Sequence, residues 1–271
     1  MKKNNSNMKH VLITGATGGM GRSAAEILVG KGYTVFALDR SPMEYPPEGV
    51  IPITADVTDS ESVSAAFEEI KKHTDKLYGI LHFAGIYMLN SLIEMSEEEF
   101  ERIFRVNLLG AFLINKTFAP MLTQGSRILI TTSELAPLHP LPFTGVYAVS
   151  KAALDRYAYS LRMELQLLGI SVSVLRAGAV NTGMLTVSTD ALDRFCQKTE
   201  LYSCNSKRFK RIVDGVEARR ITTEKLAKKA AGIIEKKRPK FAYHINRNPL
   251  LLLLEALPDR FRFWVIKKIL K

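Results

Sequence analysis

Short apolar runs alternate with stretches in which apolar residues recur at helical spacing over the first two thirds of the chain. The apolar runs are rich in Val, Ile and Leu, which is typical of strands buried on both sides of a sheet. The expected strands cover residues 10–14, 34–38, 50–54, 79–83, 127–132 and 171–175. Strands that alternate with helices predict an α/β fold with a doubly wound parallel sheet of about seven strands and helices on both faces.

Two capping boxes mark the starts of helices between these strands. Thr58 with Glu61 predicts a helix that ends near residue 73, and Ser96 with Glu99 predicts a longer helix that continues to about residue 121. Further helices are expected over residues 21–32, 145–168 and 222–237. Residues 183–215 are polar, basic and only weakly periodic.

The length of the chain and the distribution of its charge indicate how it is organised. Its 271 residues, 46% of them hydrophobic, suffice for one large domain, and no linker or repeat divides it. We expect a catalytic domain over residues 1–247 and an apolar, basic extension over residues 248–271. The net charge of +11 arises in the last 78 residues, which hold 21 Lys and Arg against 7 Asp and Glu. No nucleic-acid motif accompanies this charge, so nucleic acid is not an expected partner.

The two cysteines, Cys196 and Cys204, give no disulfide framework and are expected to be free thiols in a reducing compartment. The N-terminus lacks the apolar segment of a signal peptide, and no run reaches the roughly 18 apolar residues of a spanning helix. We therefore expect a cytoplasmic protein, and no metal site.

A glycine-rich loop joins the first expected strand to the first helix. It consists of Gly15, Ala16, Thr17, Gly18, Gly19, Met20 and Gly21. Glycine lets the chain turn tightly and approach a diphosphate without a Cβ in the way, and the helix N-terminus offers free N–H groups. The loop therefore predicts a nucleotide site.

Asp39 ends the second expected strand, 18 residues after Gly21. A carboxylate at this place accepts hydrogen bonds from an adenosine ribose and repels a 2′-phosphate, which favours NAD(H). The adjacent Arg40 could clamp a 2′-phosphate, so NADP(H) stays the alternative. Asp56 could bind the adenine amino group or could serve only as a turn residue before Thr58.

Tyr147 and Lys151 lie four residues apart in a predicted helix, so their side chains share one face. A neighbouring ammonium group favours the tyrosinate and should lower the tyrosine pKa from its usual value near ~10. Such a tyrosine can exchange a proton with a substrate oxygen near neutral pH. The pair is a weak motif alone, but the preceding glycine loop makes it specific.

Together these motifs resemble the short-chain dehydrogenase/reductase family over about residues 9–183. The resemblance implies a Rossmann-type fold and assigns the catalytic roles to Asn107, Ser133, Tyr147 and Lys151, where Lys151 also holds the nicotinamide ribose and Asn107 holds a water that relays protons. It also implies cofactor contacts for Val57, Phe83, Ala84, Gly85, Asn107, Gly178, Val180 and Thr182. Thr132 is a weaker candidate for the role of Ser133. His82, which stands where the family has asparagine, is expected to pack beneath the cofactor, and Glu134 is expected to be a solvated loop acid.

The family resemblance places a substrate-binding loop at about residues 183–215, with Met184, Leu185, Leu192, Phe195, Leu201, Tyr202 and Phe209 as its apolar content. We expect oxidation or reduction of a secondary alcohol or ketone on a hydrophobic steroid-, retinoid- or lipid-like substrate, as in the hydroxysteroid and retinol dehydrogenase branch. The C-terminal tail could close the cleft, form a dimer contact or lie peripherally on the inner membrane face. A homodimer or homotetramer is expected from the family. The alternatives are a non-catalytic NAD-binding sensor or scaffold, an oxoacyl-thioester reductase, and an epimerase or dehydratase of the same fold.

Overall fold

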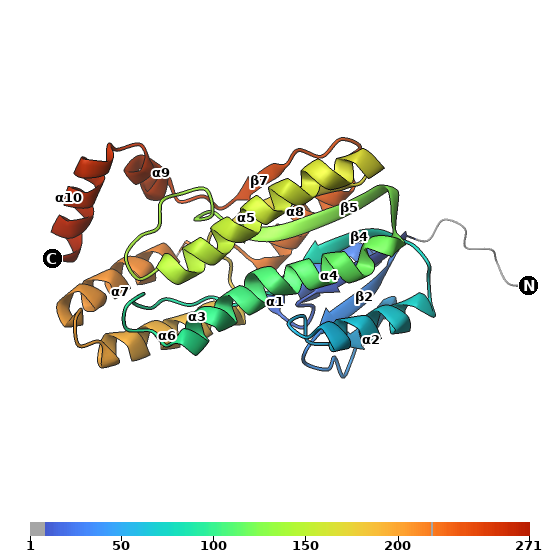
Figure 1. Cartoon of the computed structure of the whole chain (residues 1–271), viewed down its shortest axis with the longest axis horizontal. Helices are drawn as coiled ribbons and strands as arrows, with labels where there is room; N and C mark the ends of the chain where they lie inside the picture. Colours follow the sequence, from blue (N-terminus) through green and yellow to red (C-terminus); the bar gives the residue numbers. More distant parts are fainter. Residues whose placement is uncertain (1–8, 218) are drawn as a thin grey trace, which may run out of the picture.

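The computed structural model describes residues 9–217 and 219–271, apart from the side chains of 184–189 and 216–217. Its centre is a seven-stranded parallel sheet with the strand order β3-β2-β1-β4-β5-β6-β7 (Figure 1). The strands are β1 (Lys9–Thr14), β2 (Tyr33–Asp39), β3 (Val50–Thr54), β4 (Leu77–His82), β5 (Leu122–Ser133), β6 (Ser171–Ala177) and β7 (Ala242–Ile245). The predicted doubly wound sheet is confirmed, and each expected strand is found within a few residues of its predicted ends.

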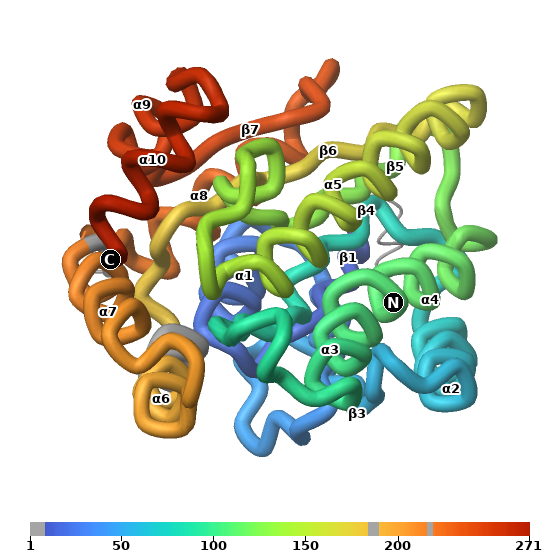
Figure 2. The backbone as a smooth tube through the Cα atoms, turned by 60° about the vertical axis from the view of Figure 1, so that its left-hand side comes forward, coloured from blue at the N-terminus to red at the C-terminus, as the bar shows by residue number. Residues whose placement is uncertain are grey.

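Helices cover both faces of this sheet, as Figure 2 shows. They are α1 (Gly19–Gly30), α2 (Ser60–Lys71), α3 (Glu97–Phe104), α4 (Gly110–Phe118), α5 (Gly145–Leu165), α6 (Gly183–Lys198), α7 (Ser203–Glu217), α8 (Thr223–Ile234), α9 (Pro249–Glu255) and α10 (Asp259–Leu270). A π-helical turn over Arg105–Leu109 joins α3 to α4, so the long helix predicted from Ser96 is one rod with an irregular centre.

Alternate side chains of each strand pack into two separate cores. In β1, Val11 and Ile13 belong to the core beneath α1 and α8, whereas Leu12 belongs to the core beneath α2, α4 and α5. Residues of opposite parity point to opposite faces of a strand, so both faces of β1 are dry. This burial on both sides explains why the strands are continuous apolar runs in the sequence.

The connection order places a crevice beside β1. From β1 the chain moves outward to β2 and β3, and then crosses back to β4 on the other side of β1. Ligands of open α/β sheets bind at the carboxyl ends of the strands where this reversal occurs. Thr14 and His82 are paired at these ends, and the amide of Phe83 donates to the carbonyl of Thr14 at 3.0 Å.

Two local predictions are wrong. The cap of α2 is Asp59, whose carboxylate accepts from the Glu61 amide, and the Thr58 hydroxyl instead donates to Asp56. Residues 183–215, expected to be a loop, instead form most of the helices α6 and α7. The capping box of Ser96 and Glu99 is present as predicted.

The two helices α6 and α7 bury a third apolar cluster with the end of the chain. This cluster joins Leu192 and Phe195 of α6 to Phe209 of α7 and Leu270 of α10. The side-chain amide of Asn205 also donates to the carbonyl of Leu270 at 2.7 Å. The C-terminal extension is therefore packed against the body of the protein, and α9 and α10 lie together at one end of the molecule (Figures 1 and 2). None of the helices in the described ranges combines the length and hydropathy needed to cross a bilayer.

Candidate active site

The glycine loop is a tight turn that only glycine can build. Gly15 has a φ of +70°, and a Cβ there would lie 2.6 Å from the amide nitrogen of Ala84. A Cβ on Gly21 would lie 2.2 Å from the carbonyl oxygen of Gly15. Helix α1 starts at Gly19 with Gly18 as its cap and no side chain bonded to its first N–H groups. These donors lie at the mouth of the crevice, where a diphosphate would be bound.

Asp39 holds this loop in place. One carboxylate oxygen accepts from the Thr17 amide at 3.0 Å, and the other accepts from the Ser41 amide at 3.0 Å. Asp56 fills the turn role that the sequence left open, because it accepts from both the amide and the hydroxyl of Thr58 at 2.8 Å. These hydrogen bonds, together with the charge of Arg40, lower the pKa of Asp56.

A groove follows the loop along the ends of the strands, with about 1820 Å³ of empty space including the part open to solvent. The predicted cofactor residues that line it are Gly15, Thr17, Gly18, Gly19, Met20, Asp39, Arg40, Asp56, Val57, Phe83, Ala84, Gly85 and Thr182. Gly21 instead packs against the loop, and Gly178 and Val180 line the adjoining cleft described below. Open N–H groups, backbone without Cβ atoms and a carboxylate at the far end fit an adenine dinucleotide.

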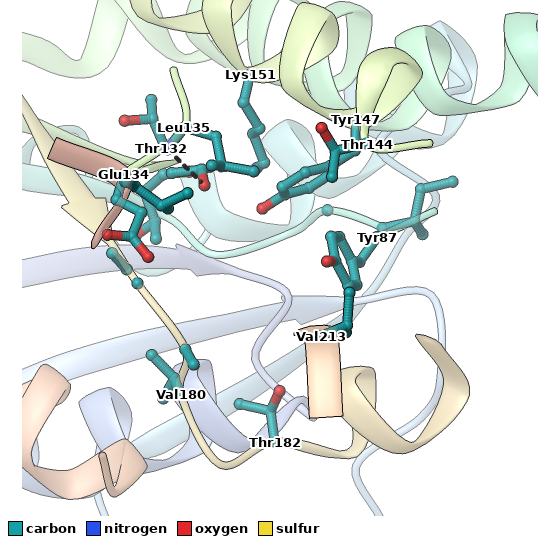
Figure 3. Close-up of a pocket in the computed structure, with 18 of the residues that line it drawn as sticks. Tyr87, Thr132, Glu134, Leu135, Thr144, Tyr147, Lys151, Val180, Thr182 and Val213 are labelled. Carbon is teal, nitrogen blue, oxygen red and sulfur yellow. Dashed lines mark hydrogen bonds between the residues drawn. The ribbon is translucent and has the colours of Figure 1, made fainter. Parts of the chain in front are cut away.

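Tyr147 and Lys151 extend from one face of α5 into the pocket (Figure 3). The Lys151 ammonium is buried, lies 5.9 Å from the centre of the Tyr147 ring and donates to the carbonyl of Thr131 at 3.4 Å. Ser133 ends β5 in the same pocket, and its hydroxyl accepts from the Leu135 amide at 3.2 Å. The fold thus brings the predicted tyrosine, lysine and serine to one place from two elements.

The pKa of Tyr147 does not move in the predicted direction. Burial raises it to about 12, the Glu134 charge adds to this rise, and a hydrogen bond with Ser133 opposes it. Burial also lowers the pKa of Lys151 to about 8. For both groups, burial removes water from the charged form, and this has a larger effect on the pKa than the neighbouring side chain does.

Asn107 lies in an irregular turn of its helix and is buried beside the pocket, but it is not among the described residues that line either space. In the π turn the Gly110 amide donates to the Arg105 carbonyl, five residues back. The Asn107 amide group accepts from the Ile86 amide at 2.8 Å and donates to the Ser150 hydroxyl at 3.0 Å. π turns of this kind occur often at functional sites. The water relay expected of Asn107 stays a prediction.

A Cβ on Gly85 would meet both predicted polar groups. It would lie 3.1 Å from the Asn107 amide oxygen and 3.2 Å from the Lys151 nitrogen. Gly85 therefore leaves room for Asn107 and Lys151 to approach the same stretch of backbone, which explains the glycine at this position.

Two neighbouring polar groups are structural. His82 is buried and shares a 3.0 Å hydrogen bond with Asn115, and burial lowers its pKa to about 4, so it is neutral. Thr132 donates to Asp155 at 3.2 Å, and Asp155 is paired with Arg176. Thr132 and Ser133 both line the pocket, but the Thr132 hydroxyl is bonded to Asp155.

Glu134 is buried, contrary to the expected solvated acid, and is 8% exposed. One of its carboxylate oxygens accepts from the Asn248 amide at 2.6 Å, which ties the start of the C-terminal extension to the pocket. Burial raises the pKa of Glu134. No local sequence pattern predicts this contact, because the two residues lie 114 positions apart.

A second cleft opens from the groove beside Tyr147, and Met20, Phe83, Gly85, Ile86 and Thr182 line both spaces. Figure 3 shows Tyr87 beside Tyr147, with Val180 and Thr182 across the pocket. The Tyr87 and Tyr147 rings meet edge to face with centroids 4.5 Å apart. The outer wall consists of Phe209, Ile212, Val213 and Leu251.

Phe209 was expected at this cleft, and Leu251 agrees with the reading in which the C-terminal tail closes it, whereas Tyr87 was not expected. Of the other apolar residues expected at this cleft, Leu192 and Phe195 are buried in the third cluster and Tyr202 packs against it, whereas Leu201 is exposed. The side chains of Met184 and Leu185 lie outside the described part of the structure.

Comparison with known proteins identifies the same family. The family model described as short chain dehydrogenase matches residues 9–193. An uncharacterized oxidoreductase of Escherichia coli is 36% identical over 179 residues, which are 64% of this chain and 66% of that protein. A 3-ketodihydrosphingosine reductase of Bacteroides thetaiotaomicron is 27% identical over 263 residues, 95% of this chain and 96% of that protein.

Among solved structures, a short-chain dehydrogenase from Streptomyces avermitilis is similar with a TM-score of 0.75 at 18% identity, covering 97% of this chain and 96% of that one. At this identity the likeness concerns the fold alone. It extends over the sheet and the C-terminal part of the chain.

Proposed function

Because the chain belongs to the short-chain dehydrogenase/reductase family and is an NAD(P)-dependent oxidoreductase, we propose that it interconverts a ketone and a secondary alcohol on a long, lipophilic substrate. The observation that carries this proposal is the continuity of two spaces. The dinucleotide groove opens beside Tyr147 into a cleft whose outer wall is aliphatic and aromatic. A binding site of this kind favours an apolar ligand with one polar reacting group.

The proposed chemistry assigns one task to each polar side chain. When bound, the nicotinamide supplies or accepts the hydride. Tyr147 gives a proton from its phenol oxygen to the substrate oxygen in reduction and removes it in oxidation. Ser133 donates a hydrogen bond to the same oxygen and stabilises the charge that develops there. Lys151 supplies a positive charge and returns a proton to the tyrosine, and Asn107 orders the surrounding backbone.

We favour NAD(H) over NADP(H) for this chain. The Asp39 carboxylate is fixed by two amide donors at the end of β2, where an adenosine ribose would lie. Arg40 is exposed beside it, so the two side chains act in opposite directions on a 2′-phosphate.

We further propose that the substrate carries an amino group near the reacting carbon. Among the described residues that line the cleft, Glu134 is the one acid, and it influences the pKa of Tyr147 through its charge. This buried carboxylate accepts from the Asn248 amide, and a substrate ammonium would add a charged partner that compensates the loss of solvation of both charges. The relative that spans nearly the whole chain is named a 3-ketodihydrosphingosine reductase, a name that denotes a long-chain amino ketone.

A substrate panel tests these proposals. Purified protein is assayed by reduced-cofactor absorbance with a long-chain 3-keto-2-amine, the same ketone without the amine, a 3-oxoacyl thioester and a hydroxysteroid, each with NADH and NADPH. We expect turnover of the long-chain ketones, with the amino ketone preferred and NADH the better cofactor. No turnover of any member, with intact cofactor binding, would favour the sensor or scaffold alternative. Preference for the thioester would favour the oxoacyl reductase.

A further inference from the structure

Helix α10 packs Ile266 and Leu270 against the third apolar cluster, but the distribution of its other side chains is inverted. Its arginine Arg262 is 3% exposed, whereas Phe261, Phe263 and Trp264 are 50%, 64% and 57% exposed. A helix on a protein surface normally buries its aromatic residues and exposes its charges. The inversion indicates that the outward face of α10 is covered when the protein works.

The buried arginine shows that this orientation is specified rather than accidental. Arg262 is paired with Asp259 and, at 3.4 Å, with Glu255 at the end of α9. Glu255 also contacts the ring of His139, 2.5 Å away, and accepts from the His139 amide at 3.1 Å. A buried arginine with such partners fixes the rotation of the helix about its axis, because turning it outward would leave the acids unpaired.

The exposed side chains form one aromatic and basic face. We define the α10 face by Arg260, Phe263, Trp264, Lys267, Lys268 and Lys271, which are all exposed and recur at spacings of three and four residues. Such positions lie along one side of a helix. Phe261 stacks on Trp264 at the margin of this face, with ring centroids 5.6 Å apart and planes inclined by 16°.

The positive charge of the α10 face indicates which kind of partner can cover it. Four of its six members are cationic, and the one acid of α10, Asp259, is bound to Arg262. Two copies of the chain meeting through these faces would bring like charges together, which is unfavourable. Aromatic rings beside lysines are instead suited to the interface of a bilayer with anionic headgroups, where each Lys or Arg adds to binding.

The neighbouring helix connects this face to the cleft. Leu250 and Leu253 of α9 are 63% and 65% exposed, while Leu251 on the same helix lines the cleft. The carboxylate of Glu134 holds the amide of Asn248 just before α9. We propose that the α10 face, with Leu250 and Leu253 beside it, docks on an anionic lipid surface, so that the cleft is loaded from the membrane side.

The only tryptophan of the chain reports directly on this face. Trp264 is the sole Trp among 271 residues, so its emission needs no label. Purified full-length protein is titrated with phosphatidylcholine vesicles and with vesicles that contain phosphatidylglycerol. We expect a shift of emission to shorter wavelength and flotation with the anionic vesicles only, both weakened by salt. Lys267→Ala with Lys268→Ala should weaken binding about 30-fold.

Matched variants separate docking from general surface effects. Lys236→Ala with Lys237→Ala removes two exposed lysines at the end of α8, and should leave binding unchanged. Phe263→Ser should weaken binding, whereas Leu167→Ser, at a residue that is 82% exposed away from α10, should not. The reporter Trp264 is retained in all four variants.

The same measurements can contradict the docking proposal. Unchanged emission with anionic vesicles at low salt would overturn the proposal. So would equal losses in the α8 and α10 lysine variants, or a shift that depends on protein concentration without lipid, which would indicate self-association. None of these measurements requires turnover. Only the loading of the cleft from the membrane rests on the proposed function, so the docking proposal and the proposed function can fail separately.

Discussion

The ammonium group of Lys151 lies 5.9 Å from the centre of the Tyr147 ring and is bonded to the Thr131 carbonyl. Burial moves the two pKa values apart, raising that of the phenol to about 12 and lowering that of the amine to about 8. Near pH 7 the phenol therefore holds its proton while the amine is close to releasing one. The phenol is therefore in the protonated form that ketone reduction would require.

Removing the phenol hydroxyl tests the proton donor. Tyr147→Phe should lower kcat for ketone reduction by about 10²–10⁴-fold, because proton transfer by a positioned side chain contributes an effect of this size. Steady-state kinetics with the substrate found by the panel measures it. Tyr159→Phe is the control, since Tyr159 lies on the same helix with its ring half exposed. A Tyr147→Phe enzyme as fast as the parent would contradict the assigned role.

The lowered pKa of Lys151 predicts an alkaline limit for reduction. If charged Lys151 is required, kcat/KM should be constant between about pH 6 and 7 and fall as pH rises through about 8, where the amine loses its proton. Lys151→Arg should move this limit upward, because a guanidinium stays charged. A profile that is the same in both proteins would assign the limit to another group.

Asp39 and Arg40 predict opposite changes in cofactor preference. Asp39→Asn keeps an oxygen for the Thr17 amide but removes the negative charge, so the ratio of kcat/KM for NADPH to that for NADH should rise about tenfold. Arg40→Ala should lower the same ratio. Parallel assays with both cofactors decide this, and equal ratios in the three proteins would show that neither residue contacts the ribose.

Gly178 provides a test of packing between the pocket and the C-terminal extension. A Cβ on Gly178 would lie 1.9 Å from the Asn246 carbonyl oxygen and 2.9 Å from a Glu134 carboxylate oxygen. Gly178→Ala should therefore destabilise the protein by about 2 kcal/mol or more in urea unfolding. Gly232→Ala, in α8 with no heavy atom within 4 Å, should instead stabilise it by about 0.5–1 kcal/mol. Equal effects would contradict the described backbone.

Sequence pattern predicted the sheet because both faces of its strands are dry. Leu12 and Ile13 enter different cores, and such runs need no knowledge of the tertiary partners to be recognised. The ends of helices were harder to predict where two neighbouring polar residues could each cap the helix. Thr58 and Asp59 are adjacent residues of types that both cap helices well, and in the structure Asp59 is the cap.

The helices α6 and α7 escaped prediction because their charged residues dilute the apolar spacing. Leu192 and Phe195 become a buried face only once Phe143 and Leu270, from distant parts of the chain, pack on them. Their helicity depends on tertiary contacts more than on local pattern.

The sequence placed the main polar residues near one another but did not predict their electrostatics. Tyr147 and Lys151 could be placed on one helical face from their spacing, whereas the direction of each pKa shift depends on burial. The position of Glu134 depends on the return of the chain at Asn248, which no local pattern records.

The π turn of Arg105–Leu109 holds one residue more than a regular turn would need. Deleting a single residue there would restore a regular α-helix, because the hydrogen bond across the turn would then span four residues instead of five. Ile114 and Phe118 would keep their places in the interior, but the widened turn that carries Asn107 would be lost. Natural variation in chain length should therefore avoid this turn, even though it is the least regular part of its helix.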